Sequence, residues 1–207
     1  MALLLLFAEK TTAQPGLEQY CYVEKDKANI WVRMIHYRTP RGWYAEGRYN
    51  YEAERSLSIY VGKEFTRKVR KGFARKSKLS MAVTPLAGIV VGDFRGLSAG
   101  LNLKLGYGKF FFGSQSQYTT SAETNALDFF FNWSELGCQP APWIYFGLSV
   151  QHTYYDVLNI NLFDPGAVIG FEIGRWAFPF YCFNIMEREK YFVWGITLNL
   201  EPGSINK

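Results

Sequence analysis

Apolar and polar residues alternate one by one along most of this chain, in segments that are separated by turns. A period of two indicates β-strands, because successive side chains of a strand point to opposite sides. Strands of about 9–11 residues with one apolar face and aromatic ends are typical of a transmembrane β-barrel. The last segment shows the pattern most clearly, with one face made of Phe192, Trp194, Ile196, Leu198 and Leu200 and the other of Val193, Gly195, Thr197 and Asn199.

Turns rich in glycine and proline divide the chain into about eleven candidate strands. Single-chain bacterial barrels have an even number of strands, so either one candidate is wrong or a weaker segment at residues 18–24 is a strand too. From the chain length we predict an all-β fold, a closed antiparallel up-and-down transmembrane barrel of about 10 strands, within a range of 8–12. The candidates are residues 29–37, 43–51, 57–65, 79–91, 97–105, 109–118, 127–134, 144–153, 167–173, 180–185 and 191–200.

The N-terminus carries the only long apolar run of the chain, residues 2–8. This run is far shorter than the ~20 residues that a spanning helix requires. We interpret residues 1–14 as a degenerate or truncated signal peptide, although no basic residues precede the apolar run and Glu9-Lys10 interrupts it. The remaining chain then divides into a lead-in (15–27), the barrel (28–200) and a C-terminal tail (201–207).

A soluble sandwich or a lipocalin-like barrel would show a similar alternation, with its apolar face inside. The composition of the polar face separates the two alternatives. A soluble protein exposes mainly Lys, Glu and Asp, whereas the polar face here carries Gly, Ser, Asn, Thr, Gln and Tyr. The aromatic content of 18% also suits a membrane–water boundary. We therefore expect the apolar faces to contact lipid and the polar faces to line the lumen.

Two segments need separate interpretation. In residues 127–134, the alternation predicts that the apolar side chains face lipid and the polar side chains face the lumen. Pro85 lies inside the candidate strand 79–91 and suggests a bulge or a local break. In the first segment, Leu127, Phe129, Phe131 and Trp133 oppose Asp128, Asn132 and Ser134.

Charged residues on the polar faces are the first candidate functional residues. Charges in a barrel interior either form pairs that fill it or line a small pore. Large inward side chains, Tyr44, Tyr60, Phe130 and Tyr145, favour a mostly filled interior. The charged residues that we expect to point inward are Glu46, Arg48, Glu64, Lys104, Asp128 and Glu172.

The rhythm of strands and turns, the N-terminal segment and the final strand 191–200 resemble small bacterial outer-membrane β-barrel proteins. Three short phrases are similar to poorly characterised barrels of Bacteroidota: Ala13-Gln14, Tyr49-Asn50-Tyr51-Glu52 and Asn132-Trp133-Ser134-Glu135. The resemblance implies a bacterial outer-membrane location. It also implies outer-membrane lipid and lipopolysaccharide as partners, with other envelope proteins as further candidates. It implies no particular activity.

A basic run at residues 67–78 supplies more positive charge than the whole net charge of +5. In an exported barrel its partner would be lipid phosphate, anionic polysaccharide or an acidic protein surface, and not nucleic acid. Counting hairpins back from a periplasmic C-terminus places this loop in the periplasm. A solvated loop without a partner is the simpler interpretation. The cations are Arg67, Lys68, Arg70, Lys71, Arg75, Lys76 and Lys78.

Catalytic chemistry finds little support in the sequence. The histidine bases available are His36 and His152, and Ser149 lies three residues from His152, hence on the opposite face of the strand. We expect no catalytic residue, no metal site and no cofactor. The three cysteines follow no disulfide or metal-site spacing, and free buried thiols are expected at Cys21, Cys138 and Cys182.

Three functions therefore remain, in decreasing order of support. The first is a non-enzymatic integral barrel, either a structural or accessory protein or a narrow channel for small solutes. The second is a subunit of a larger cell-envelope complex, whose outer wall would carry a flat or polar patch. The third is a barrel enzyme acting on membrane lipids, in which His36 or His152 would meet a serine and a carboxamide or carboxylate at the membrane boundary.

Overall fold

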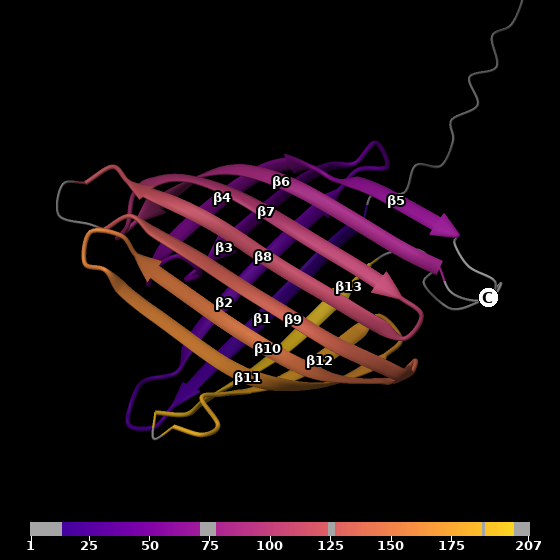
Figure 1. Ribbon diagram of the computed structural model, residues 1–207. Helices are drawn as coiled ribbons and strands as arrows, with labels where there is room; N and C mark the ends of the chain where they lie inside the picture. The colour runs from indigo at the N-terminus through magenta and orange to yellow at the C-terminus, as the bar shows by residue number, and fades with distance from the viewer. Residues whose placement is uncertain (1–13, 71–77, 124–126, 188, 201–207) are drawn as a thin grey trace, which may run out of the picture.

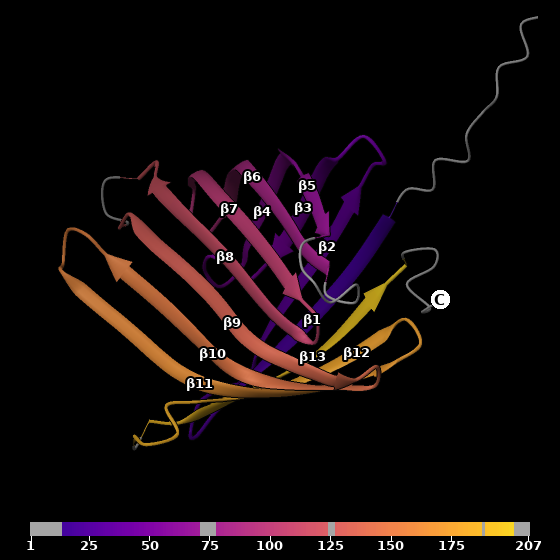
Figure 2. The same ribbon diagram turned by 45° about the vertical axis from the view of Figure 1, so that its right-hand side comes forward.

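The computed structural model describes residues 14–70, 78–123, 127–187 and 189–200, which form antiparallel strands around a common interior (Figures 1 and 2). The proposed signal peptide, apart from Gln14, and the C-terminal tail lie outside these residues. The strands are β1 (Gln14–Glu24), β2 (Ile30–Arg38), β3 (Trp43–Tyr49), β4 (Ser56–Lys63), β5 (Phe65–Arg70), β6 (Lys78–Gly92), β7 (Gly96–Tyr107), β8 (Phe110–Ser121), β9 (Phe129–Ala141), β10 (Ile144–Tyr155), β11 (Ile160–Ile173), β12 (Trp176–Phe183) and β13 (Tyr191–Asn199).

Each strand pairs with its neighbours in sequence, and pairing of β1 with β13 closes the barrel. β4 and β5 are two parts of one strand. Both pair with β6 in the same register, from Ser56 opposite Gly92 to Arg70 opposite Lys78. The closed barrel thus has twelve strands when the two parts count as one, which confirms the fold class and lies two above the central estimate of ten.

The interruption between β4 and β5 falls at Glu64, next to the position that pairs with Pro85 in the same register. Proline has no N–H to donate to a neighbouring strand, so the ladder is weakened there. The Glu64 N–H instead donates to the carbonyl of Gly42 across the short turn before β3, at 2.7 Å. The local break expected from Pro85 therefore appears in its partner strand, without a change of register.

The segment expected to be a lead-in, residues 15–27, contributes the first strand. β1 runs from Gln14 to Glu24 and pairs along its length with both β2 and β13. The weak candidate at residues 18–24 is thus a strand, and it starts earlier than the pattern predicted. The alternation is faint because the outward face includes Gln19 and Cys21 between Leu17 and Val23.

The two ends of the barrel differ in their connections. Gly16 pairs with Asn199, so the start of β1 and the end of β13 lie at one end of the barrel, which we call the terminal end. The two-residue connections 108–109, 142–143 and 174–175 are at this terminal end. Connections at the opposite end, the loop end, include 25–29 and 50–55, of five and six residues.

The outer wall is apolar, as the alternation predicts. Large apolar side chains stand exposed around it, including Leu148 at 67%, Leu97 at 64% and Ile35 at 60% of their surface. Side chains of the opposite parity, such as Arg48 and Ser58, are buried in the interior. Among the described residues, the structure has no helix that is long and apolar enough to span a membrane.

In β9 the expected faces are reversed. Phe129 and Trp133 are buried in the interior, together with Phe131, whereas Asn132 and Ser134 lie on the outer wall. Glu135 explains the reversal, because it shares the face of Trp133. A carboxylate on the lipid side is far more costly than the amide and hydroxyl groups of the other face.

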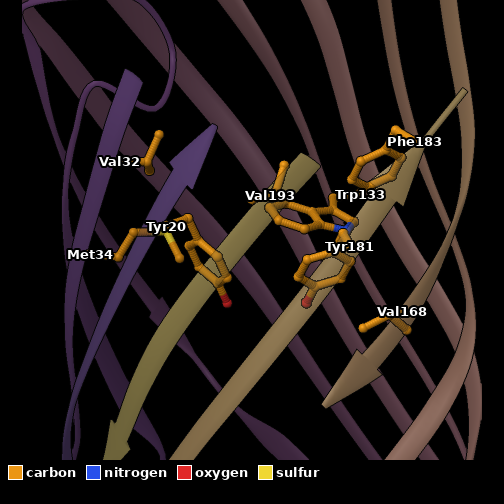
Figure 3. Close-up of a cluster of buried hydrophobic side chains, with 8 residues drawn as sticks. All are labelled: Tyr20, Val32, Met34, Trp133, Val168, Tyr181, Phe183 and Val193. Carbon is orange, nitrogen blue, oxygen red and sulfur yellow. The ribbon is translucent and has the colours of Figure 1, made fainter. Parts of the chain in front are cut away.

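The interior contains an aromatic cluster contributed by strands from opposite sides of the barrel (Figure 3). Trp133 of β9 packs edge-to-face on Tyr181 of β12, with ring centroids 5.1 Å apart, and lies 5.4 Å from Tyr20 of β1. Val32 and Met34 of β2 belong to the same cluster. Side chains of the described strands therefore fill the middle of the barrel.

Candidate functional site

The barrel interior has two regions. A cavity of about 300 Å³ occupies the part toward the terminal end, where its lining includes Ala177, Asn199 and Lys104. Tyr20, Trp133 and Tyr181 of the aromatic cluster also line this cavity. Beyond that cluster, toward the loop end, side chains pack closely. The candidate site is therefore a cavity that ends on a layer of packed side chains.

Arg48 is the centre of the packed layer. Its Nε donates to Glu46 at 2.6 Å and its Nη1 donates to Gln117 on β8 at 2.5 Å. Nη1 also lies 3.5 Å from a carboxylate oxygen of Glu52. Its guanidinium lies between two aromatic rings, 4.4 Å from the centroids of both Tyr51 and Tyr60. A buried arginine needs such pairing, because an uncompensated charge in the interior is very costly.

The connection 50–55 supplies two members of this layer, Tyr51 and Glu52. Glu52 accepts hydrogen bonds from the hydroxyls of Ser58 and Tyr60, the latter at 2.9 Å. Tyr51 packs edge-to-face on Phe131 of β9, with centroids 5.5 Å apart. Through the side chain of Tyr51, the connection between β3 and β4 thus contacts the opposite wall.

Further hydrogen bonds cross the interior nearby. Gln151 of β10 donates to the hydroxyl of Tyr22 on β1 at 2.9 Å, and the hydroxyl of Tyr191 donates back to Gln151 at 3.2 Å. Together with Arg48 and Gln117, these bonds connect facing walls through side chains only. Within the described residues, the layer therefore closes the lumen without a loop domain or a helix.

The cavity wall carries more acids than bases. Both carboxylate oxygens of Glu64 accept a hydrogen bond from Arg38 Nη1, each at 2.7 Å. A carboxylate oxygen of Glu18 lies 3.6 Å from His36 Nδ1. Glu135 accepts a hydrogen bond from Tyr181 at 2.8 Å. The carboxylates on the wall are Glu18, Glu46, Glu64 and Glu135, against the cations Arg38 and Lys104.

Glu135 and Lys104 differ from the other charged groups of the cavity. Among the residues that the structure describes, neither takes part in an ion pair. Gly113 lies between them in the register, opposite Lys104 on one side and Glu135 on the other. A Cβ at Gly113 would have no neighbour within 4 Å, so this stretch of wall is open space. Glu135 and Lys104 therefore line the same open stretch of the cavity wall.

Four of the six charged residues expected inside line the interior: Glu46 and Arg48 in the packed layer and Glu64 and Lys104 in the cavity wall. Glu172 lies on the inward side of β11 at the terminal end, paired with the cavity-lining Ala177.

Asp128 was expected in the lumen, and this is wrong. It precedes the reversed strand β9, and its carboxylate accepts from the backbone N–H of Ser121 at 2.7 Å at the loop end. Phe130 follows the same reversal, and its ring contacts His152 on the outer wall.

The described residues of the basic run lie at the terminal end of the barrel. Arg67, Lys68 and Arg70 belong to β5, and Lys78 begins β6. Lys71, Arg75 and Lys76 lie outside the described residues. β5 pairs with β6 along its whole length, and β3 ends before reaching it. The anionic partner of this run stays a prediction.

Sequence analysis missed Glu18, Glu52 and Glu135. Glu18 follows from alternation once β1 is accepted as a strand. Glu135 could have been found from the sequence, because its charge decides which face of β9 can meet lipid. Glu52 could not be found in this way, because it belongs to a connection in which alternation does not apply.

Neither histidine forms the arrangement that hydrolysis requires. His36 stacks on Tyr44 inside the barrel, with centroids 5.9 Å apart. His152 lies on the outer wall, where its Nε2 is 2.7 Å from Asn161 Oδ1. Within the described part of the chain, no hydrogen bond joins either imidazole to a serine hydroxyl. Ser149 instead accepts from the indole of Trp133 at 2.9 Å.

Comparison with known proteins gives structural matches only. No protein-family model and no curated protein sequence matches the chain. Among solved structures, the KdgM porin is similar, with a TM-score of 0.61 and 8% identity over 90% of this chain and 99% of that one. The KdgM porin in complex with disordered oligogalacturonate matches with a TM-score of 0.60 and 8% identity, over 90% of this chain and 99% of that one. The NanC porin matches with a TM-score of 0.54 and 8% identity, over 90% of this chain and 100% of that one. The fold of this chain is thus similar to that of porins.

Proposed function

We propose that this protein is a non-enzymatic outer-membrane β-barrel that forms a narrow channel for small solutes, held closed by the side-chain layer around Arg48. The apolar outer wall supports insertion into a membrane. The porin-like fold supports the outer membrane as its location. An origin in Bacteroidota rests on sequence phrasing alone and stays a prediction.

The connections favour one orientation. Barrels of this kind have short periplasmic turns and longer extracellular loops. Three connections of the terminal end have two residues, whereas those of the loop end have three to seven, so we infer that the terminal end faces the periplasm, with the cavity on that side. The packed layer then separates the cavity from the cell exterior.

The observation that carries the channel proposal is the nature of the closure. In the part of the chain that the structure describes, the interior is crossed at Arg48, Gln117 and Tyr51 by side chains of the wall and of the connection 50–55. Side-chain rearrangement needs no unfolding of the barrel and occurs on rapid timescales. Opening can therefore occur within an intact wall, which distinguishes a gated channel from a solid structural barrel.

The cavity also indicates which solutes suit the channel. The KdgM porin was solved in complex with oligogalacturonate, a polyanion. Here three carboxylates, those of Glu18, Glu64 and Glu135, face the cavity against the cations Arg38 and Lys104, and the fourth carboxylate of the wall, Glu46, is paired with Arg48. A wall of this sign attracts cations and repels anions. We infer that neutral and cationic small solutes pass in preference to acidic oligosaccharides.

Planar-bilayer recording of the purified full-length chain tests this proposal. Folding is verified first by a shift in gel migration between unboiled and boiled samples. We expect small, infrequent openings, and a reversal potential in a KCl gradient that shows preference for K⁺. A folded, inserted protein that never conducts would favour a structural barrel, and an anion preference would contradict the assignment of solutes.

A further inference from the structure

The reversal of β9 leaves a polar patch on the apolar outer wall. We call Ser114, Ser116, Asn132 and Ser134 the wall patch. Ser116 pairs with Asn132 and Ser114 with Ser134 in the β8–β9 register, so the four side chains form two adjacent rows. β8 and β9 are neighbouring strands in the side of the barrel that Figure 2 shows nearest the viewer.

Hydrogen bonds connect the wall patch internally. The Asn132 amide donates to Ser114 Oγ at 2.9 Å and to Ser116 Oγ at 2.8 Å. Ser134 Oγ lies 2.9 Å from Ser114 Oγ and 2.8 Å from Asn132 Oδ1. Ser116 accepts from Asn132 but, among the described residues, has no acceptor for its own hydroxyl hydrogen. The patch is thus ordered but not saturated.

The surroundings of the wall patch are mostly apolar, although His152 of β10 pairs with Asn132 on the outer wall. Leu101 and Leu103 of β7 pair with Ser116 and Ser114, and both face outward. On the other side, Val150 of β10 pairs with Ser134, and a shallow groove continues along Leu136 and Leu148. Ser114 and Ser134 lie well inside their strands, away from either end. The patch therefore lies within the band that would contact lipid chains.

Lipid chains offer no hydrogen-bond partners, and a polar group left unpaired there is costly. Lipid headgroups lie near the barrel ends and do not reach this depth. The occupant that satisfies the patch is therefore a protein surface with polar groups at the same depth. This reasoning rests on the membrane insertion proposed above.

We propose that the wall patch is the contact surface for a second copy of this chain within the membrane. Two copies inserted in the same orientation are related by an axis along the membrane normal, which brings each patch to its equivalent at equal depth. Such a contact requires a self-complementary surface. Hydroxyl and amide groups meet this requirement because they both donate and accept. The adjacent groove accommodates exposed leucines of the partner.

Two variants test the contact. In lipid vesicles of phosphatidylcholine, subunits are counted by single-molecule photobleaching of the labelled full-length chain. We expect dimers for the natural sequence, and at least a tenfold lower dimer fraction for Asn132→Leu. Because leucine suits a lipid-facing site, this variant should keep the gel-migration shift of the folded barrel. Val61→Leu, on the wall of β4, is the matched control and should leave dimers unchanged.

Cross-linking gives an independent measurement if Asn132→Leu does not fold. In a background whose natural cysteines are replaced by serine, Ser116→Cys should form a covalent dimer under oxidation. Ile35→Cys on the opposite wall should not. A folded protein that stays monomeric, or equal cross-linking at both positions, would overturn the proposal. Absence of the migration shift in the natural sequence would instead contradict the membrane barrel itself.

Discussion

The indole N–H of Trp133 donates a 2.9 Å hydrogen bond to the hydroxyl of Ser149 inside the barrel. The bond joins β9 to β10 on their inner faces and holds the largest aromatic side chain of the interior in place. It is consistent with the inward direction that Glu135 imposes on β9, because Trp133 cannot face both Ser149 and lipid. The aromatic cluster in the interior and the wall patch on the outside both follow from the direction of β9.

Lipid-quenching fluorescence tests the direction of β9. In variants that retain a single tryptophan, brominated lipid should quench Trp194, which lies on the outer face with Phe192, several times more strongly than Trp133. The reason is that bromine atoms on acyl chains reach only the outer wall. Equal quenching of both tryptophans would contradict the reversed strand.

Sequence alternation predicts the barrel but not every face. The alternation shows which residues of a strand share one face. Which of the two faces meets lipid depends on the side chains that each face carries. In β13 one set is wholly apolar, so the choice is clear. In β9 both sets are mixed, and the carboxylate of Glu135 outweighs three aromatic rings. Counting apolar residues misjudges such a strand, whereas charge decides it.

The strand count and the packed layer around Arg48 show two further features that alternation does not predict. β1 alternates weakly because Gln19 and Cys21 face outward, and the small Cys21 is covered by Trp31 and Trp194, whose rings are 5.2 Å apart. Its role follows only from the need to close the sheet. Tyr51 and Glu52 enter the interior through the path of a loop, which no periodic pattern describes.

Arg48→Met should destabilise the barrel. The substitution leaves Glu46 and Glu52 without their shared cation in the interior, and breaking a buried ion pair typically costs about 3–5 kcal/mol. Urea unfolding in detergent, followed by gel migration, measures the loss. Arg175→Ala at an exposed turn should change stability by less than about 0.5 kcal/mol.

A second substitution identifies the cause of that loss. Adding Glu46→Gln to Arg48→Met removes one of the two uncompensated carboxylates and should recover part of the stability. If Arg48→Met alone costs no more than the surface control, water reaches this layer and the charges are not buried.

Tyr51→Ala should open the channel more often. The substitution removes the ring that packs on Phe131 and on Arg48 without removing a strand residue. We expect a severalfold rise in mean current across planar bilayers at equal protein insertion. Tyr154→Ala, which removes a tyrosine from the outer face near the loop end, is the control and should leave current unchanged. An unaltered current in Tyr51→Ala would move the closure elsewhere in the interior.

Glu135→Gln should reduce the preference for cations. Glu135 faces the cavity, and within the described residues it forms no ion pair, so its neutralisation changes the field without freeing a cation. A unit charge about 4 Å from a permeating ion contributes about 1 kcal/mol even in water, which corresponds to roughly a fivefold change in the permeability ratio of K⁺ to Cl⁻. Lys104→Gln should shift the ratio in the opposite direction, because it removes a cation from the same wall. Reversal potentials in a KCl gradient measure both variants against the natural sequence. Shifts of the same sign in the two variants would show that these residues act on the shape of the lumen and not through their charge.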